Sequence, residues 1–600
     1  MNILLVAVNA KYIHSNLAVY SLKAYAEKHF ADWAKTVPEQ RCWEKQNHAS
    51  VSIDIAEYTI NQPLDQILMD LYKKKPEILC FSCYLWNISY IEQLVCEISK
   101  VMPEIEIWLG GPEVSWNAED VLQRLPQVRG VMRGEGEATF LDVVHFYEGA
   151  FENCGKGFDD ILGITYYKEE VREEKTERFI VSTEERPVMA DLNGIPFVYE
   201  DIEAFEHKII YYESSRGCPF SCSYCLSSID KCLRFRDLEL VKRELQFFID
   251  HDVPQVKFVD RTFNCRHDHA MEIWKYVAEH DKGVTNFHFE VAADLLNEEE
   301  IALIASMRPG LIQLEIGIQS TNMQTIQEIR RTMRFEKVKK IVEQIHAKGN
   351  IHQHLDLIAG LPYEDYQRFR CSFNEVYALK PEQLQLGFLK VLKGSYMEEK
   401  AKDYQLVYQD RPPFEVLSTA WISYDEVIAL KGIEEMVEVY YNSRQFEKTL
   451  ELLEKEFDDA CAMFEKLRDY YETKGLDQIN HTRISRYEIL FDFVKQLLKE
   501  KHLEGKIASY QESLIYDLYL RENVKNRPVF AGEDTVDKQT AAAFYEKEEQ
   551  ERRYLKGYER YDKRQMRKMT HLERIGGNLL LFDYQNRSPL THQAAVYTVL

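Results

Sequence analysis

The segment Arg216-Gly217-Cys218-Pro219-Phe220-Ser221-Cys222-Ser223-Tyr224-Cys225 contains three cysteines in a C-x-x-x-C-x-x-C pattern, directly after the strand-like run 209–214. Thiolates at this spacing on one short loop can hold three irons of a cubane cluster and leave the fourth iron without a protein ligand. Twelve cysteines in 600 residues would give this spacing by chance roughly 0.005 times. The sequence therefore predicts a 4Fe-4S cluster on Cys218, Cys222 and Cys225.

Two alternatives to a cluster remain for these cysteines. A zinc site would need a fourth ligand, and no residue is spaced to supply it. Three buried thiols without a metal are the other alternative.

The cysteine loop lies in a stretch of six strand-like runs that alternate with helical segments. The runs cover 209–214, 256–259, 287–291, 311–316, 351–357 and 384–388. Six consecutive strand–helix units predict a partial (β/α)6 barrel over residues 207–395, with its chemistry on loops at the carboxyl ends of the strands.

The rest of the chain divides by texture into three further parts. Residues 1–145 alternate apolar strands with amphipathic helices, which predicts an α/β, doubly wound domain of flavodoxin-like (Rossmann-type) fold. In residues 146–206 the alternation of strands and helices stops, and we expect a linker with a hairpin. Residues 396–600 are rich in Glu, Lys, Leu and Tyr in helical patterns, so we expect a mainly α-helical carboxyl-terminal domain that ends in strands.

Composition constrains the partners and the compartment. The chain carries 99 acidic and 75 basic side chains, a net charge of −24, which disfavours a nucleic-acid partner. No apolar run approaches the length of a membrane span, and Met1 opens directly into a strand-like segment. The scattered cysteines do not form a secreted disulfide framework, so we expect a cytoplasmic protein without a membrane partner.

The cysteine triplet, with Tyr224 before its last cysteine and six strand–helix units behind it, resembles the radical S-adenosylmethionine (SAM) superfamily. The resemblance covers residues 208–388. It implies that SAM chelates the open iron and that the reduced cluster cleaves SAM to a 5′-deoxyadenosyl radical, so the three cysteines would be catalytic as well as metal ligands. It also implies an electron donor, either a reductase or a flavodoxin or ferredoxin, and a substrate that the sequence does not identify.

Further positions match this family. The segment Leu314-Glu315-Ile316-Gly317-Ile318-Gln319-Ser320, followed by Arg331, resembles an E-x-G-x-Q-S plus arginine signature of its methylthiotransferase-like branch. By this match Glu315 and Gln319 face the ribose or amino-acid end of SAM, and Arg331 its carboxylate. The segment 356–362 resembles the adenine-contacting turn, with Gly360 allowing close approach, and Tyr224 completes the predicted SAM site. A capped barrel strand and a surface cation are the alternative interpretation of these residues.

The amino-terminal domain resembles the cobalamin-binding domain that precedes the barrel in one large radical SAM branch. The resemblance rests on domain order and on the turns after three strands, and it implies cofactor contacts by Ser82, Gly110, Gly111, Gly134 and Glu135. The D-x-H-x-x-G loop that supplies a cobalt ligand elsewhere is absent, and His14 is wrongly spaced to replace it. An empty flavodoxin-like domain that caps the barrel is the alternative.

These features predict a cobalamin-dependent radical SAM enzyme that cleaves SAM reductively, for C-methylation or another radical transformation. Two other functions stay open. One is a methylthiotransferase-like radical SAM enzyme without cobalamin, against which the chain lacks a second cysteine triplet. The other is a non-catalytic cobalamin-sensing protein, against which the cysteine triplet is intact.

Overall fold

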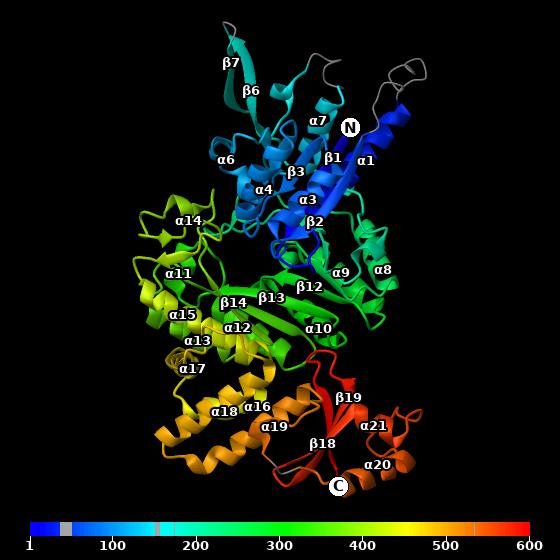
Figure 1. The fold of residues 1–600 in the computed structure, drawn as a ribbon, viewed down its shortest axis with the longest axis vertical. Helices are drawn as coiled ribbons and strands as arrows, with labels where there is room; N and C mark the ends of the chain where they lie inside the picture. Colours follow the sequence, from blue (N-terminus) through cyan, green and yellow to red (C-terminus); the bar gives the residue numbers. More distant parts are fainter. Residues whose placement is uncertain (37–50, 150–155, 173–174, 533–534, 600) are drawn as a thin grey trace.

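The computed structural model describes residues 1–600 except 37–50, 150–155, 173–174, 533–534 and 600. The chain runs from the amino-terminal domain at one end of the long axis, through the barrel, to the carboxyl-terminal domain at the other end (Figure 1). The order of the domains in the sequence is therefore their order in space.

The amino-terminal domain is built on five parallel strands in the order β2-β1-β3-β4-β5. This is the flavodoxin-like strand order. The strands are β1 (Asn2–Asn9), β2 (Ser52–Thr59), β3 (Ile78–Ser82), β4 (Glu106–Gly110) and β5 (Gly130–Met132).

Helices cover both faces of this sheet. Alternate residues of β1 explain why, since Leu4, Val6 and Val8 belong to one apolar cluster, whereas Ile3, Leu5 and Ala7 belong to another. A strand buried on both faces needs a layer of helices on each side. The helices are α1 (Leu17–Thr36), α3 (Leu64–Lys74), α4 (Ile88–Val101), α5 (Pro112–Ser115), α6 (Ala118–Arg124) and α7 (Gly136–Tyr147).

The hairpin that we expected in the linker extends this sheet instead. Strand β6 (Ile164–Arg172) pairs antiparallel with β5, and β7 (Lys175–Ser182) pairs antiparallel with β6. Ile164 and Tyr166 at the base of the hairpin are buried in the sheet core. The pairing with β5 is therefore stabilised by apolar contacts, and the linker proper begins after Ser182.

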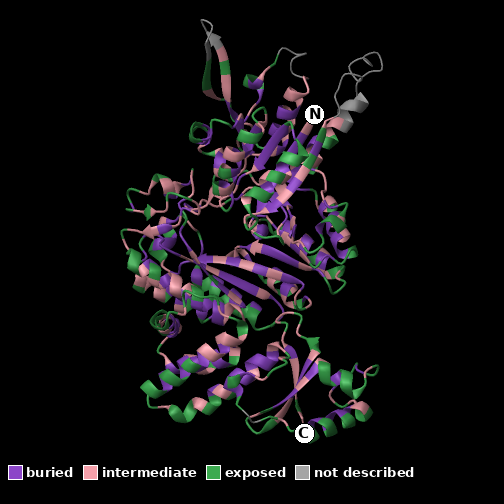
Figure 2. Ribbon diagram, in the orientation of Figure 1, coloured by how far each residue is buried: buried purple, intermediate pink, exposed green. Residues whose placement is uncertain are grey.

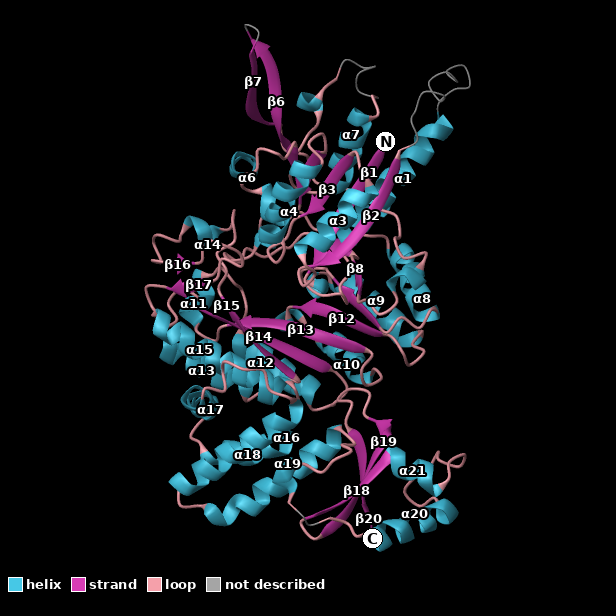
Figure 3. Ribbon diagram, in the orientation of Figure 1, coloured by secondary structure: helices cyan, strands magenta, loops and turns pink. Residues whose placement is uncertain are grey.

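The middle domain is an open, all-parallel barrel with strand order β15-β14-β13-β12-β11-β8. This confirms the predicted partial (β/α)6 barrel (Figure 3). The strands are β8 (Ile210–Tyr212), β11 (Gln255–Phe258), β12 (Asn286–Val291), β13 (Ile312–Gln319), β14 (His352–Ala359) and β15 (Gln383–Phe388). The helices are α8 (Leu238–Asp250), α9 (His267–Glu279), α10 (Glu298–Ser306), α11 (Met323–Glu328), α12 (Phe335–His346) and α13 (Tyr366–Tyr377).

Alternation along the barrel strands separates an apolar face from a polar one. Phe287, Leu314 and Leu355 are fully buried in the apolar cluster of the barrel. The residues that alternate with them, such as His288, Glu315 and His354, are polar. Filled barrels carry bulky branched side chains inside, so this polar lining marks the inner face as a place for polar contacts.

The carboxyl-terminal domain is mainly helical, as predicted, and its helices carry buried residues on one side and exposed residues on the other (Figure 2). One continuous apolar cluster includes residues of this domain and of the barrel. It begins with α14 (Tyr396–Glu399) and the short pair β16 (Val407–Tyr408) and β17 (Val416–Ser418). Its helices are α15 (Tyr424–Met436), α16 (Glu447–Leu453), α17 (Ala460–Lys474), α18 (Arg483–Glu500), α19 (Ile507–Arg521), α20 (Lys538–Glu551) and α21 (Lys563–Met569). The chain ends in an antiparallel sheet of β18 (Thr570–Ile575), β19 (Asn578–Arg587) and β20 (Ala594–Val599).

Among the described residues, none of the helices combines the length and the apolar character needed to cross a membrane.

Candidate functional site

The cysteine loop leaves the barrel at the carboxyl end of β8 and is closed at its base by a short antiparallel pair. Strand β9 (Ser215–Arg216) pairs with β10 (Arg234–Phe235). Gly217, with φ of +97°, could not carry a side chain because the carbonyl oxygen of Cys232 occupies the Cβ position. The Cys218 N–H donates to Asp230 O at 3.1 Å, so the loop starts from a fixed position.

The three cysteines fit a cluster. All three are free thiols; Cys218 and Cys222 are buried and Cys225 is half-buried. Burial raises the pKa of the Cys218 thiol, and the nearby Cys225 and Cys222 raise it further. Thiolates gathered this way repel one another until a cation holds them, as the irons of a cluster would.

Arg331 joins the predicted SAM residues to this loop. Its Nη1 lies 3.8 Å from Cys222 Sγ and donates to the Tyr224 hydroxyl at 3.3 Å, and its Nη2 donates to Gly317 O. Gln319 follows a register shift in β13 with φ of +71°, and its amide, like Arg331 Nη2, crowds the Cβ position of Gly317. The structure therefore brings Tyr224, Gln319 and Arg331 together beside the cluster loop.

Unsatisfied atoms in this group fit SAM. Arg331 Nε and Gln319 Oε1 are buried and have no hydrogen-bond partner. Buried polar atoms of this kind are normally paired. A ligand with a carboxylate and an amino group, such as the methionyl end of SAM, would supply the missing acceptor and donor.

Glu315 lies in a different set of contacts. Its Oε2 is 3.1 Å from Lys257 Nζ and 3.0 Å from His288 Nε2. Burial acts to raise the pKa of Glu315, but His288 and Lys257 lower it to about 2. The structure thus places an ionised Glu315 among basic groups of the inner barrel face, and its contact with SAM stays a prediction.

Gly360 has φ of +85°, and a Cβ there would lie 2.6 Å from Val416 Cγ1. The chain that approaches Gly360 closely is therefore β17 of the carboxyl-terminal domain. The adenine contact of Gly360 stays a prediction, and Val416 is a neighbour that the sequence pattern did not reveal.

The predicted cobalamin turns lie together at the carboxyl edge of the first sheet. Gly134, with φ of +73°, has open space where a side chain would be, whereas a Cβ on Gly111 would lie 2.5 Å from Cys83 O. A Cβ on Gly110 would only touch Met132. Ser82 Oγ accepts a hydrogen bond from Asn16 Nδ2 at 3.2 Å, and Asn16 Oδ1 is buried without a partner.

Further features of this edge fit a large cofactor. Tyr84 and Trp86 stack with ring centroids 4.4 Å apart just after Ser82. Trp86 is 47% exposed. An open glycine turn, an unpaired amide oxygen and a stacked aromatic pair with one exposed ring are features of a ligand site. In the loop after β1, His14 Nδ1 lies 2.7 Å from the Tyr211 hydroxyl, so this nitrogen is engaged with barrel strand β8.

Two ion pairs tie this edge to the cluster loop. Glu135 Oε1 accepts from Arg234 Nη1 at 2.7 Å, and Glu137 Oε1 accepts from Arg216 Nη2 at 2.8 Å. Burial acts to raise the pKa of Glu137, but Arg216 lowers it overall. These arginines flank the cysteine loop at both ends, so the turn after β5 and the cluster loop are fixed to each other.

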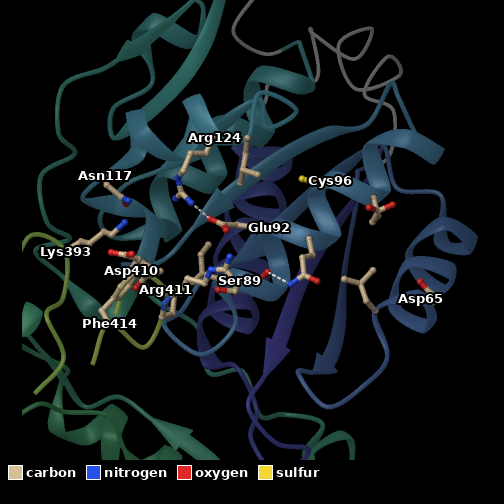
Figure 4. A pocket seen from close by; sticks show the side chains of 17 residues that line it. Asp65, Ser89, Glu92, Cys96, Asn117, Arg124, Lys393, Asp410, Arg411 and Phe414 are labelled. Carbon is tan, nitrogen blue, oxygen red and sulfur yellow. Dashed lines mark hydrogen bonds and ion pairs between the residues drawn. The ribbon is translucent and has the colours of Figure 1, made fainter. Parts of the chain in front are cut away.

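A cavity of about 840 Å³ lies beside the same domain (Figure 4). It is bounded by α4, by Glu113 after the β4 turn, by Lys393 after the last barrel strand, and by Phe414 near the start of the carboxyl-terminal domain. Burial raises the pKa of Glu113 to about 7.

Cys80 and Cys83 do not form a second metal site with the cluster cysteines. Both are buried along or next to β3, and burial raises the pKa of Cys80 to about 12. We therefore interpret Cys80 and Cys83 as unreactive thiols of the hydrophobic core.

Three family models match the chain. The B12 binding domain model matches residues 3–144, the Radical SAM superfamily model matches residues 212–374, and the model described as "Protein of unknown function (DUF4080)" matches residues 402–596. The matches follow the order of the three domains in the structure.

Two curated relatives are named as methyltransferases. The 2-(S-pantetheinyl)-carbapenam-3-carboxylate methyltransferase of Streptantibioticus cattleyicolor is 23% identical over 74% of this chain and 68% of its own length. The cobalamin-dependent radical SAM methyltransferase TokK of Streptomyces tokunonensis is 24% identical over 56% of this chain, and the match spans about half of TokK, 51%.

Solved structures share the fold. The cobalamin-dependent SAM radical enzyme OxsB, with aqua-cobalamin and SAM bound, matches with a TM-score of 0.56 at 14% identity over 86% of this chain and 79% of its own. The radical SAM methyltransferase TsrM from Kitasatospora setae, with cobalamin and a 4Fe-4S cluster bound, matches with a TM-score of 0.51 at 14% identity over 69% of this chain and 82% of its own.

The domain matches confirm the cofactors predicted from the sequence, which are a 4Fe-4S cluster, SAM and cobalamin. The chain is a radical SAM enzyme with an amino-terminal B12 binding domain and a carboxyl-terminal DUF4080 domain.

Proposed function

We propose that this enzyme methylates an unactivated carbon of its substrate in a space shared by the two cofactors. The observation that carries the proposal is the pair of contacts Glu135–Arg234 and Glu137–Arg216, which fix the predicted cobalamin edge to the cluster loop. Relatives named as methyltransferases support the choice of reaction.

SAM on the reduced cluster supplies a hydrogen-abstracting radical, and cobalamin supplies the methyl group. The chain's own residues bind and position. Arg331, held by Gly317 O and Tyr224, would pair with the SAM carboxylate beside Cys222. Gln319 Oε1 would accept from the SAM amino group.

On the other side of the shared space, Gly134 would let a corrinoid approach the backbone. Trp86, exposed next to Ser82, would give the cofactor an aromatic contact and keep water away from it.

We also propose a cytoplasmic location with a reductase, a flavodoxin or a ferredoxin as electron donor, because the cluster thiolates need a reducing compartment. The excess of acidic side chains still disfavours a nucleic-acid substrate.

The test is anoxic incubation of the reconstituted protein with cobalamin, a reductant and SAM labelled in its methyl group. We expect bound cobalamin, 5′-deoxyadenosine, and transfer of the label from SAM to the cobalamin. The matched control is the triple variant C218S/C222S/C225S, which should bind cobalamin without cleaving SAM.

Other outcomes would favour the alternatives. Cleavage of SAM without any uptake of cobalamin would support a methylthiotransferase-like enzyme. Uptake of cobalamin by the wild-type protein without cleavage of SAM would support a cobalamin sensor.

A further inference from the structure

The inner face of the barrel carries a second group of ligand-type side chains, formed by Glu315, His354 and Asp356. Glu315 on β13 lies opposite His354 on β14 in the parallel register, and Asp356 lies two residues further along β14. One carboxylate oxygen from each acid and one imidazole nitrogen all lie within 4.8 Å of one another. Two adjacent strands thus present three potential metal ligands at one point.

The atoms of this group are close together but do not satisfy one another. His354 Nε2 lies 3.1 Å from Asp356 Oδ1. Neither atom is in hydrogen-bond geometry with this or any other partner. His354 is only 7% exposed. Because buried polar atoms are normally hydrogen-bonded, this pair needs either a shared proton, for which the 3.1 Å separation is short enough, or a cation in its place.

The contacts of Glu315 also suit a metal ligand. Lys257 Nζ donates a hydrogen bond to Oε2 of Glu315 at 3.1 Å. His288 Nε2 lies 3.0 Å from the same oxygen but not in hydrogen-bond geometry. No hydrogen bond is described for the other oxygen, Oε1. Metal-binding carboxylates are commonly held in this way, with one oxygen fixed by neighbouring donors.

The charges leave room for a cation. Glu315 and Asp356 each contribute one carboxylate. The ammonium group of Lys257 balances the negative charge of one of them, and without a metal ion a protonated His354 would have to balance the other. A metal ion replaces that proton.

We infer that Glu315, His354 and Asp356 form a divalent cation site in the barrel, separate from the cluster. One imidazole and two carboxylates suit Mn²⁺, Fe²⁺ or Zn²⁺. Three protein ligands leave coordination positions open, as in catalytic metal sites. The site would therefore bind an oxygen or nitrogen atom of the substrate through the metal.

The test is a titration of the cluster-loaded protein with Mn²⁺ at about pH 8, where histidine is largely unprotonated. The electron paramagnetic resonance signal of free Mn²⁺ reports binding, and the oxidised cluster, which is diamagnetic, does not interfere. We expect one Mn²⁺ ion to bind tightly per chain (one tight equivalent), with a higher affinity than the weak binding of Mn²⁺ to acidic groups on the surface.

Variants separate this site from other binding. H354Q and D356N should weaken the tight equivalent by at least about 100-fold, since loss even of an outer-shell partner costs about 10- to 100-fold. The matched control H352Q changes a histidine two residues earlier on β14, outside the group, and should leave the tight equivalent unchanged. Cluster absorbance shows that each variant is folded.

Absence of a tight equivalent in the wild-type protein would overturn the inference. So would a tight equivalent that persists in both H354Q and D356N. The titration reads binding directly, so the inference stands or falls independently of the proposed methyl transfer.

Discussion

Arg331 is a half-buried side chain beside the cluster loop, where we predict the SAM carboxylate. Its guanidinium touches Cys222, Tyr224 and Gly317 O while its Nε stays unpaired. Replacing it removes a fixed cation from the side of the cluster where we place the SAM carboxylate. The residue is thus a direct probe of the predicted SAM orientation.

We predict that R331Q keeps its cluster and loses SAM affinity by at least about 10-fold, because a charge-assisted hydrogen bond contributes about 1.5–3 kcal/mol. Equilibrium dialysis with SAM measures the affinity, and iron analysis measures the cluster. The matched control is R334Q, which removes an exposed arginine three residues later and should change neither. Unchanged SAM affinity in R331Q would contradict the proposed orientation.

Single residues also show where prediction from sequence ends. Motif and spacing selected the cysteines, Gln319 and Arg331, which the structure brings close together, and their roles stay predictions. Positive-φ glycines were also recognisable, but the sequence does not reveal what approaches them. Cys83 O lies against Gly111, and Val416 lies against Gly360 across more than fifty positions of chain. Partners this distant in sequence come from tertiary packing.

Among the elements, the β5–α7 turn and the cluster loop form one unit. Glu137 at the start of α7 is 6% exposed and pairs with Arg216. Arg216 also pairs with Glu213 and Glu135, so it would keep two partners if Glu137 were neutral. The pair therefore fixes the geometry between the two domains as well as contributing to stability.

We predict that E137Q lowers the free energy of unfolding by about 1–3 kcal/mol, the cost of a weakened buried hydrogen-bonded pair. We also expect it to weaken cobalamin binding, because the turn is no longer fixed to the barrel. Urea unfolding and a cobalamin titration measure the two effects. The control E104Q changes an exposed glutamate outside the turn, and equal behaviour of the two variants would exclude a positioning role for Glu137.

The cavity between α4 and the start of the carboxyl-terminal domain predicts a pH dependence. Burial raises the pKa of Glu113 to about 7 from an ordinary value of 4.5; Glu92 raises it too, whereas Lys393 and Arg124 lower it. Between these values the unfolded chain releases the proton first, so this carboxyl lowers the free energy of unfolding as the pH rises.

The variant E113Q cannot ionise. We therefore expect its stability relative to wild type to increase from about pH 5 to about pH 7 and then level off. Urea unfolding at a series of pH values measures the difference, with E104Q as the control. A difference that stays constant or shrinks over this range would show that Glu113 ionises normally.

Periodicity predicted most elements well, since long buried strands and amphipathic helices leave strong patterns. All six barrel strands lie within a few residues of their expected positions. The carboxyl-terminal domain is mainly helical and ends in strands, as expected, but the bounds of its separate helices come only from the structure. The hairpin of β6 and β7 was found, but its pairing with β5 depends on tertiary contacts that periodicity does not encode.

At the scale of the whole molecule, the barrel contacts both the amino-terminal and the carboxyl-terminal domain. The barrel and the carboxyl-terminal domain share an apolar cluster that runs from Tyr199 to Ala594. The amino-terminal domain is held by ion pairs at the cluster loop and by His14 at β8. Domain order and type could be predicted from sequence, whereas these contacts between domains could not, because each joins residues of unrelated motifs.

The central claim is that cobalamin and the cluster share one space. The most direct measurement is the electron paramagnetic resonance spectrum of cob(II)alamin bound to the protein, recorded with the cluster oxidised and then reduced. We predict that reduction broadens or splits the cob(II)alamin signal, because two unpaired spins held by the paired edges interact magnetically. A cob(II)alamin signal that is identical in the two states, with both cofactors bound in full, would contradict the account.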